Sequence, residues 1–318
     1  MRPRVFVDGH VGTVGLRIRE WLAGRDDLEV ATLPDAARKD ADARRAAMRD
    51  ADVAVLCLSD EMAREVAGWE LGARTRLLDA STAHRVADGW TYGLPELAPG
   101  QRATIASARR VSSPGCWPTG VLLLVRPLLD AGLLARDVPL TVHGLSGYTG
   151  GGKTLIEKWE DPARGLLALP FEAPYALERV HKHVPEMQRW SGLVRELQFV
   201  PAVGPFRCGM RIEIPLHAAL LGRGANAKSI WEALASRYHG EPFVRVAPYA
   251  DPVSIDERSL DPTGANDTNR VDLRVLPHPS GHVLLVALLD NLGKGAAGAA
   301  IQNLNLMLGL GETTGLRA

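Results

Sequence analysis

A glycine-spaced turn after the first apolar run constrains the fold more than any other feature of the sequence. Residues 4–8 have the pattern of a strand, and residues from about 13 to 23 have the pattern of a helix. Glycines between a strand and a helix allow a tight turn and let a pyrophosphate reach the helix N-terminus. The segment therefore predicts a dinucleotide-binding βαβ unit, with an ordinary βα turn as the alternative. The predicted cofactor-binding residues are Gly9, His10, Gly12, Thr13, Val14 and Gly15.

The rest of the first half alternates short apolar runs with helix-like segments. Such alternation is typical of the α/β class, in which a parallel sheet is wrapped by helices. The charged, alanine-rich stretch 36–50 predicts a solvated helix. The further predicted strands are residues 28–33, 53–58, 76–80 and 103–107.

The second half has a different texture, with apolar and polar residues alternating along strand-like stretches. This alternation is typical of an antiparallel sheet with one buried face. The predicted strands are residues 140–144, 197–201, 210–214, 271–275 and 282–287, followed by a helical segment over 295–310 that returns to the first domain. We expect a Rossmann dinucleotide-binding domain over 1–116 with a C-terminal helix from 292–318. The second domain, 117–291, is expected to be α+β with a mostly antiparallel mixed sheet.

The composition favours a small-molecule enzyme over a nucleic-acid or membrane protein. Lys plus Arg and Asp plus Glu both total 37, so no global basic field attracts nucleic acid or an anionic membrane. The N-terminus lacks the pattern of a secretory signal, and no apolar run reaches membrane-spanning length. Three cysteines without CxxC spacing argue against a disulfide framework and a zinc site. We expect a cytoplasmic protein without a metal, in which local charges meet any anionic substrate.

The end of the second predicted strand bears on which nicotinamide cofactor binds. Asp35 lies about twenty residues beyond the glycines, where an acidic side chain reads the ribose of NAD. Arg38 and Lys39 follow at once and are placed to meet the 2′-phosphate of NADP. We predict NADP(H), with Arg38 and Lys39 as cofactor-binding residues. The alternative is that both cations belong to the solvated helix.

Cys116 lies where a loop leads into an apolar helical run. Pro114 and Gly115 precede it, and the run 121–125 follows. The free N–H groups and the positive end of a helix dipole favour the ionised form of a thiol at such a junction. The position predicts a cysteine nucleophile.

Two histidines are candidates for proton transfer to or from that cysteine. His181 and His183 alternate along a segment that reads as extended, which places both imidazoles on one side. Imidazole exchanges protons near neutral pH, as the partner of a catalytic thiol must. A structural or solvent-exposed role is the alternative for either residue.

Two polar segments point to anion recognition. Residues 79–85 follow the fourth predicted strand at the carboxyl edge of the sheet, where open α/β sheets bind ligands, and Arg85 is suited to clamp a carboxylate or phosphate. Residues 146–153 form a glycine-rich loop with hydroxyls and a lysine, which can wrap an anion with backbone N–H groups. Its glycine spacing differs from that of a P-loop, and a flexible hinge is the alternative.

These motifs together resemble the N-acetyl-γ-glutamyl-phosphate reductase family of the short bacterial type, within the aspartate-semialdehyde dehydrogenase-like superfamily. The resemblance spans nearly the whole chain, with the motifs in the family's order. The matching segments are 5–9 with Gly12 and Gly15, 78–81 with Arg85, 114–116 with 118–120, 146–148 with 150–153, 181–187 and 290–295.

The resemblance implies an activity and a set of site residues. It implies NADPH-dependent reduction of N-acetyl-γ-glutamyl phosphate to N-acetylglutamate semialdehyde, a step of arginine biosynthesis, through a thioester on Cys116. His181 would supply the proton, with His183 in reserve. A homodimer or homotetramer is expected, with the second domain catalytic and oligomeric. The implied substrate-binding residues are Ser81, Arg85, Ser146, Gly147 and Lys294, and Asn291 would lie beside the nicotinamide.

The chain departs from the family's pattern at two positions, and other functions stay open. Ser113 stands where the family usually has asparagine, and Trp117 where it usually has tyrosine. The same chemistry on aspartyl phosphate or on a carrier-bound aminoadipyl phosphate would use the same cysteine and cofactor turn. A non-catalytic NADP(H)-binding regulator would have no need of Cys116 or of the two histidines. A cofactor-free cysteine hydrolase is opposed by the glycine turn.

Overall fold

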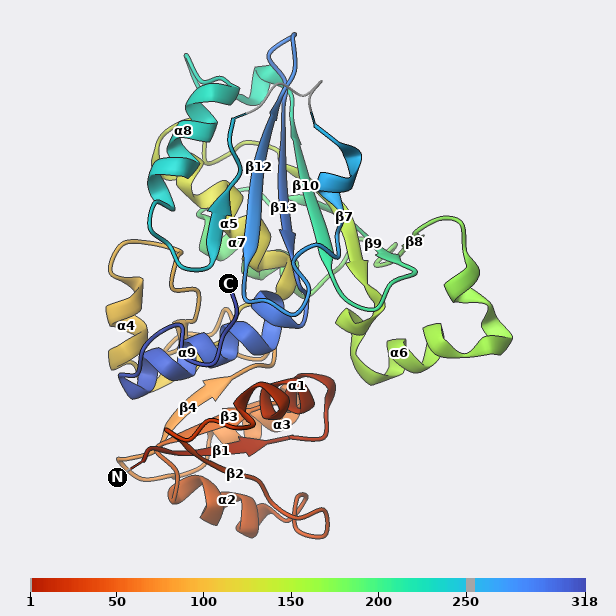
Figure 1. Ribbon diagram of the computed structural model, residues 1–318. Helices are drawn as coiled ribbons and strands as arrows, with labels where there is room; N and C mark the ends of the chain where they lie inside the picture. The colour runs from red at the N-terminus through yellow and green to blue at the C-terminus, as the bar shows by residue number, and fades with distance from the viewer. Residues whose placement is uncertain (1, 250–254) are drawn as a thin grey trace. The chain divides into compact units, whose positions relative to one another are not determined.

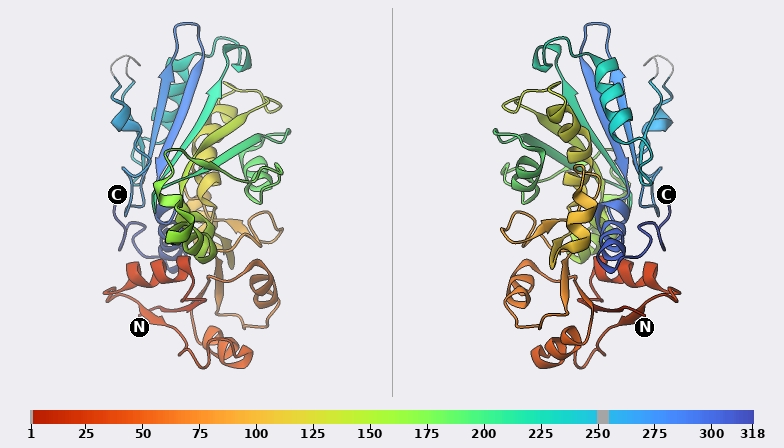
Figure 2. Two further views of the ribbon diagram at one scale, coloured as in Figure 1. Left: turned by 90° about the vertical axis from the view of Figure 1, so that its right-hand side faces the viewer. Right: turned by 90° about the vertical axis from the view of Figure 1, so that its left-hand side faces the viewer.

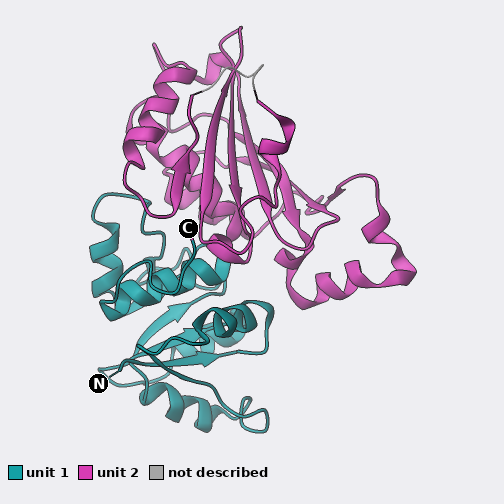
Figure 3. Cartoon of the chain, in the orientation of Figure 1, with its two compact units in different colours: residues 1–115, 296–317 teal, residues 116–295, 318 magenta. Residues whose placement is uncertain are grey.

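The computed structural model describes residues 2–249 and 255–318 and divides into two compact units (Figures 1 and 3). The first unit comprises residues 1–115 and 296–317, and the second comprises residues 116–295 with residue 318. Each unit has its own sheet. The predicted combination of a Rossmann-type α/β part and an α+β part is confirmed.

The first unit has a six-stranded sheet in the order β2-β1-β3-β4-β6-β5. All of its strand pairs are parallel, and β1 lies between β2 and β3. Parallel order places the carboxyl ends of all strands, and so the glycine turn and the loop after β4, at one edge. The strands are β1 (Arg4–Asp8), β2 (Glu29–Ala31), β3 (Val53–Leu56), β4 (Arg76–Asp79), β5 (Thr91–Tyr92) and β6 (Arg110–Ser112).

Helices cover both faces of this sheet, so its central strands are buried on both sides. Val5 and Val7 of β1 belong to one apolar core together with Ile18 and Ile301, whereas Phe6 belongs to a second core on the other face. Alternate residues of a strand point to opposite faces, which explains the division. The helices are α1 (Thr13–Leu22), α2 (Ala41–Arg49), α3 (Asp60–Ala67), α4 (Gln101–Ser107) and α9 (Gly298–Leu308).

The strand predicted over residues 103–107 is wrong, because this segment is the helix α4. Only Ile105 of these five residues is buried, and it joins the core that α9 completes. A single buried side chain in an exposed run suits one face of a helix and leaves a strand without a buried row. The strands that follow β4 in the sheet, β5 and β6, were not predicted.

The helix predicted over residues 36–50 begins later, at Ala41. Asp40 caps it, since its side chain accepts a hydrogen bond from the backbone N–H of Ala43 at 2.7 Å. Arg38 and Lys39 therefore lie in the turn before the helix. An aspartate that satisfies a free N–H group starts a helix at the next residue.

The second unit has a seven-stranded mixed sheet in the order β11-β12-β13-β10-β7-β9-β8. Its pairs are antiparallel except for β11 with β12 and β7 with β9, which confirms the mostly antiparallel mixed sheet. The strands are β7 (Thr141–Gly147), β8 (Ala173–Pro174), β9 (Gln198–Gly204), β10 (Met210–Leu216), β11 (Val244–Val246), β12 (Val271–Pro277) and β13 (Val283–Leu289).

Helix α5 (Cys116–Asp130) and helix α8 (Ala227–Arg237) pack against this sheet (Figure 2), and α7 (His183–Ser191) packs against α5. Most of α5 is buried, and its Gly120 lies against Ile212 and Ala287 of the sheet. The remaining short elements are α6 (Gly152–Glu160), the π-helix η7 (Gly293–Ala297) and the 3₁₀ turns η1 (Tyr148–Gly151), η2 (Pro162–Arg164), η3 (Leu166–Ala168), η4 (Ala218–Leu220) and η6 (Glu257–Leu260). No helix in the described ranges is long and apolar enough to cross a membrane.

Candidate active site

The glycine turn of the first unit brings three pieces of backbone into close contact. Gly9 has a φ of 80°, and a Cβ there would lie 2.2 Å from the carbonyl oxygen of Cys57. A Cβ on Gly15 would lie 2.4 Å from the carbonyl oxygen of Gly9. Side chains at either position would push β1, β3 and α1 apart, so both glycines are required by the fold.

The same turn leaves room for an anion in front of α1. Gly12 is the N-cap residue, no side chain caps this helix end, and the first turn has no acidic residue. A Cβ on Gly12 would meet its nearest atom only at 3.4 Å. Free N–H groups at a helix N-terminus without a competing carboxylate suit a pyrophosphate. The residues at this turn, Thr13 and Val14 included, therefore fit a dinucleotide.

Charged residues in the turn after β2 act on the pKa of His10. Burial lowers the pKa of His10, with Arg19 and Arg38 contributing in the same direction and Asp35 opposing them. Arg38 also lies 3.6 Å from the Asp35 carboxylate. Arg38 is thus close to the glycine turn, with Lys39 next to it in the chain, while their role in reading a 2′-phosphate stays a prediction.

A buried carboxylate organises the loop after β4. Asp79 is fully buried and accepts hydrogen bonds from the N–H and the hydroxyl of Ser81, at 2.9 and 2.8 Å. His84 Nδ1 lies 2.6 Å from the same carboxylate, and its ring stacks on Trp90. The hydrogen of the Ser81 hydroxyl is therefore used in a hydrogen bond within the loop. We did not assign a role to the Asp79–His84 pair from the sequence, although both residues lie in the segment that we singled out.

Arg85 ties this loop to the segment that precedes Cys116. Its Nε donates to the carbonyl oxygen of Ser113 at 2.9 Å, while the N–H of Ser113 donates to the carbonyl oxygen of Asp79 at 2.8 Å. Arg85 is itself buried. The structure thus shows a supporting role for Arg85, and the substrate contacts of Ser81 and Arg85 stay predictions.

Cys116 is the first residue of α5 and is half-buried. The positive end of a helix dipole favours an ionised thiol at such a position, and the thiolate of Cys116 stays a prediction. Cys57 provides a contrast, because burial and then the charges of Asp79 and Asp8 raise the pKa of its thiol. Of these two thiols, Cys116 is the one in a position suited to a nucleophile.

Gly295 packs directly against Cys116. It lies in the π-helix η7, where its N–H donates to the carbonyl oxygen of Asp290 at 2.9 Å. A Cβ on Gly295 would lie 2.7 Å from the Cβ and 3.2 Å from the Cα of Cys116. The sequence placed Gly295 in the matching segment 290–295 but gave it no role, since a π-turn leaves no pattern in the sequence. Such turns are frequent at functional sites.

An aromatic cluster joins the residue after the nucleophile to the predicted histidines. Trp117 Nε1 donates to the hydroxyl of Tyr175 at 2.9 Å, and the Trp117 ring packs edge-on against Phe199. The His181 ring lies 5.7 Å from Tyr175, 5.1 Å from Phe199 and 4.7 Å from His183, between ring centroids. The fold therefore brings both predicted histidines to the surroundings of Trp117. Tyr175 was missed, because it lies outside every motif.

The extended segment predicted around the two histidines is wrong, because α7 begins at His183. Pro185 lies in the first turn, where a missing N–H has no cost, and Glu186 adds an acidic residue there. The two imidazoles are nevertheless neighbours, since His181 lies two residues before the start of α7.

His181 is uncharged in the free protein at neutral pH. Burial, and then the positive charge of Lys182, lower its pKa to about 4, against the opposing charge of Glu178. Its Nδ1 accepts a hydrogen bond from the N–H of His183 at 3.2 Å. The neutral ring therefore carries its proton on Nε2.

The depressed pKa of His181 predicts an acid-sensitive stability. Between about pH 4 and the ordinary value of 6.5 the unfolded chain binds more protons, so the stability contributed by the neutral ring is complete above this window. It is lost as the pH falls through the window. We expect His181→Gln to lose less unfolding free energy than the parent between pH 7 and pH 5, measured by urea unfolding. The exposed His239→Gln is the control, and equal losses in parent and His181→Gln would contradict the prediction.

The glycine-rich loop of the second unit is held by Asn291. The Asn291 side chain accepts a hydrogen bond from the N–H of Gly209 at 2.8 Å and donates to the hydroxyl of Thr149 at 2.9 Å. Ser146 is buried, and its hydroxyl donates to the carbonyl oxygen of Gly147 at 3.2 Å. Asn291 thus positions the loop, and the predicted cofactor and substrate contacts of Asn291, Ser146 and Gly147 stay predictions.

Lys294 is fully buried, and its ammonium lies 5.6 Å from the ring centroid of Phe243. This is a cation–π contact inside the second unit. Its predicted contact with a substrate carboxylate stays a prediction. In the described parts of the chain, no group of three or more His, Cys, Asp or Glu side chains is arranged to hold a metal ion.

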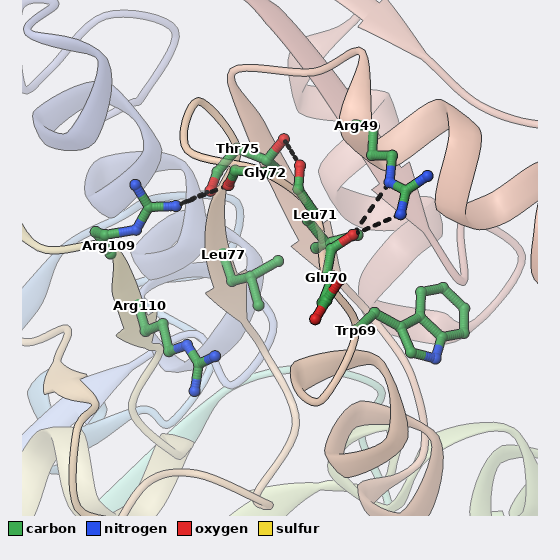
Figure 4. A pocket seen from close by; sticks show the side chains of 9 residues that line it. All are labelled: Arg49, Trp69, Glu70, Leu71, Gly72, Thr75, Leu77, Arg109 and Arg110. Carbon is green, nitrogen blue, oxygen red and sulfur yellow. Dashed lines mark hydrogen bonds between the residues drawn. The ribbon is translucent and has the colours of Figure 1, made fainter.

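A cavity of about 670 Å³ in the first unit contains none of the predicted site residues (Figure 4). It lies at the amino ends of β4 and β6, opposite the ligand-binding edge. Arg49 donates twice to the carbonyl oxygen of Glu70, and Arg109 donates to those of Gly72 and Thr75. These bonds hold the loop before β4, so we assign the residues around the cavity a structural rather than a catalytic role. Its lining residues are Arg49, Trp69, Glu70, Leu71, Gly72, Thr75, Leu77, Arg109 and Arg110.

Comparison with known proteins agrees with this arrangement. Residues 4–105 match the semialdehyde dehydrogenase NAD-binding domain, and residues 116–291 match the semialdehyde dehydrogenase dimerisation domain. The protein is thus a two-domain, nicotinamide-dependent member of the semialdehyde dehydrogenase class. It is 47% identical to N-acetyl-gamma-glutamyl-phosphate reductase 2 of Nostoc sp., over 99% of each chain. It is 46% identical to N-acetyl-gamma-glutamyl-phosphate reductase of Burkholderia lata, over 98% of each chain. The chain belongs to the family of N-acetyl-gamma-glutamyl-phosphate reductases, which confirms the resemblance found in the sequence.

Solved structures of more distant relatives share the fold. Aspartate semialdehyde dehydrogenase II of Vibrio cholerae superposes with a TM-score of 0.71 at 18% identity, over 97% of this chain and 99% of that one. Aspartate semialdehyde dehydrogenase of Francisella tularensis gives 0.70 at 15% identity, over 97% and 100%. At these identities the likeness concerns the fold alone.

Proposed function

We propose that this protein reduces N-acetyl-γ-glutamyl phosphate to N-acetyl-L-glutamate 5-semialdehyde with NADPH and releases phosphate, a step of arginine biosynthesis. The names and near-complete coverage of its relatives support this substrate. The observation that carries the chemistry is a cysteine at the start of α5 whose neighbour, Trp117, lies in one cluster with His181 and His183.

The glycine turn is the proposed site for the cofactor pyrophosphate. The N-terminus of α1 faces it with N–H groups, Gly12 leaves the space, and His10, Thr13 and Val14 line the turn. Arg38 and Lys39 are proposed to bind the 2′-phosphate, which would distinguish NADP from NAD. When bound, NADPH supplies the hydride for the reduction.

The first half of the reaction uses Cys116 as a nucleophile. The thiolate attacks the acyl carbon, the carbon–sulfur bond forms, and the bond to phosphate breaks with phosphate as the leaving group. The helix end at Cys116 stabilises the thiolate before attack. The loop 146–152, held by Asn291, is proposed to place Ser146 and Gly147 beside the acyl group, with Arg85 and Lys294 meeting negative charge on the substrate.

The second half reduces the thioester and regenerates the thiol. After reduction the tetrahedral intermediate collapses, the carbon–sulfur bond breaks, and the aldehyde leaves. Negative charge that develops beside the neutral His181 ring raises its pKa, so that the ring takes up a proton from solvent; the ring then gives this proton to the sulfur as the carbon–sulfur bond breaks, and it is neutral again. His183 is the reserve for this role.

We further propose that the protein works in the cytoplasm as a homodimer or homotetramer. The match of residues 116–291 to a dimerisation domain supports assembly through the second unit. One face of its sheet carries alternating, partly exposed residues such as Arg211, Glu213 and Arg274, beyond the face that α5 covers. The cysteine content fits a reducing compartment.

The reverse reaction tests the substrate assignment. The protein is supplied with N-acetylglutamate semialdehyde, phosphate and NADP⁺, and NADPH formation is followed by its absorbance. We expect turnover that requires phosphate. Turnover with aspartate semialdehyde but none with N-acetylglutamate semialdehyde would overturn the assignment in favour of aspartyl phosphate chemistry.

Replacing both cations of the turn after β2 tests the cofactor preference. We expect Arg38→Ala with Lys39→Ala to raise the KM for NADPH about tenfold or more, because charge-assisted hydrogen bonds to a phosphate are lost. The KM for NADH should change little. Arg64→Ala, which removes an exposed cation from α3, serves as the control. Equal changes with both cofactors would contradict 2′-phosphate recognition.

A further inference from the structure

Three arginines surround the cavity of the first unit, which contains none of the predicted site residues. Arg49 is the last residue of α2, Arg110 is the first residue of β6, and Arg109 precedes it. In Figure 4 Arg109 and Arg110 lie on one side of the cavity and Arg49 lies on the other. The cavity volume of about 670 Å³ falls within the range of small-molecule sites, roughly 300–1,000 Å³.

Backbone carbonyl groups hold the three guanidinium groups in place and leave part of each one able to donate. Arg49 donates to the carbonyl oxygen of Glu70 through Nε and Nη2, and Arg110 Nη2 donates to that of Ala67 at 3.1 Å. Arg109 donates to the loop before β4 through Nη1 and Nη2. Within residues 2–249 and 255–318, Arg49 Nη1, Arg109 Nε and Arg110 Nη1 donate no hydrogen bond. Each guanidinium therefore has a fixed position and N–H groups that can still bind a ligand.

The positive charge around the cavity has no carboxylate to balance it. Glu70 is the acidic residue of the lining, and in the described ranges no ion pair joins its carboxylate to any of the three guanidinium groups. Arg74, which precedes β4, is by contrast paired with Asp52 at 3.4 Å. Burial lowers the pKa of Arg76, and the charge of Arg109 lowers it further, which is the direction that repulsion between like charges gives. An anion in the cavity would relieve this repulsion.

We propose that this cavity is a second anion site, in which Arg49, Arg109 and Arg110 bind a small polyanion with phosphate or carboxylate groups. A guanidinium group can donate two parallel hydrogen bonds to either kind of group. Three guanidinium groups around one cavity favour a ligand with more than one anionic group. The site lies at the amino ends of β4 and β6, opposite the edge that carries the glycine turn. It is therefore separate from the proposed cofactor site, and the inference does not depend on the proposed function.

The test is the protection of single arginines from phenylglyoxal, which modifies guanidinium groups, in the full-length protein. Peptide mass spectrometry follows each arginine separately, so a probe bound at the glycine turn does not disturb the measurement. The probes are inorganic pyrophosphate for phosphate ligands and citrate for carboxylate ligands. At a probe concentration about ten times its Kd, about one tenth of the sites stay empty, so modification of Arg49, Arg109 and Arg110 should slow about tenfold. Arg64 and Arg223 are exposed outside the cavity and serve as internal controls.

Each outcome of the protection experiment decides the inference. Slower modification at the three cavity arginines, with no such effect of sodium chloride at the same ionic strength, supports the site, and the effective probe shows which kind of anionic group it takes. Equal protection by sodium chloride or equal protection of Arg64 overturns it, since the cavity then holds an adventitious ion only. Lack of protection by both probes overturns it as well.

Arg49→Gln tests whether the arginines act on one ligand. The concentration of the effective probe that halves the modification rate of Arg109 should rise about tenfold or more, because charge-assisted hydrogen bonds to the anion are lost. Arg74→Gln is the matched control, since it removes a cation that Asp52 already pairs, and it should leave this concentration unchanged. Urea unfolding checks that the variants fold, and Arg110→Gln, followed at Arg109, is the second variant. Unchanged protection of Arg109 in either folded cavity variant would contradict a shared site.

Discussion

Replacing Cys116 by serine is expected to abolish turnover, with a fall in kcat on the order of 10⁴-fold or more. The serine hydroxyl nearly matches the thiol in size, but it stays protonated where a thiol at a helix N-terminus ionises. The thioester cannot form, and direct reduction of the acyl phosphate lacks a covalent route. Because the glycine turn that fits the cofactor belongs to the other unit, NADPH binding should be retained.

Stopped-flow or steady-state assays of the reverse reaction measure this loss, and fluorescence titration measures NADPH binding. Cys57→Ala is the matched control, since burial raises the pKa of the Cys57 thiol and removes it as a nucleophile. Measurable turnover by Cys116→Ser near the parental rate would show that the covalent mechanism is wrong. Loss of NADPH binding as well would show a wider structural effect, and the variant Cys116→Ala would then be needed to separate the two.

Gly295→Ala is expected to lower kcat about 100-fold while the chain still folds. The added methyl would lie 2.7 Å from the Cβ of Cys116 and 3.0 Å from the carbonyl oxygen of Asp290. Carbon atoms prefer separations of roughly 3.5–4.0 Å, so Cys116 or the π-turn must move. A displacement of about 1 Å at a reacting group can cost 10²-fold in rate. Overpacking should also lower the unfolding free energy by about 1–3 kcal/mol.

The signature of this variant is a loss in kcat without a comparable rise in the KM for NADPH. Gly264→Ala is the control in the same unit, because a Cβ there would meet its nearest atom at an ordinary 3.5 Å. Denaturant unfolding of both variants separates the catalytic effect from the loss of stability. Parental kcat in folded Gly295→Ala would contradict the contact that the structure shows between Gly295 and Cys116.

Local patterns predicted most of the elements because the forces that produce them act within a few residues. The strand–glycine–helix unit at residues 4–22 was readable because glycine spacing and apolar periodicity are both local. The segment 103–107 was wrongly predicted as a strand, because its conformation depends on a distant partner. Ile105 is buried by α9, which lies nearly at the other end of the chain.

The same division holds for the candidate site. The position of Cys116 at the start of α5 follows from the chain around it, since a loop that leads into an apolar helical run places this thiol at the positive end of the helix dipole. The surroundings of that thiol do not follow from it. Gly295 contacts Cys116 from a π-turn. The Tyr175 hydroxyl accepts a hydrogen bond from Trp117, and the next residue, Ala176, has a φ of 51°. Contacts between segments far apart in the chain are set by packing and leave no local pattern, which is why the sequence could indicate the nucleophile while folding alone could select its neighbours.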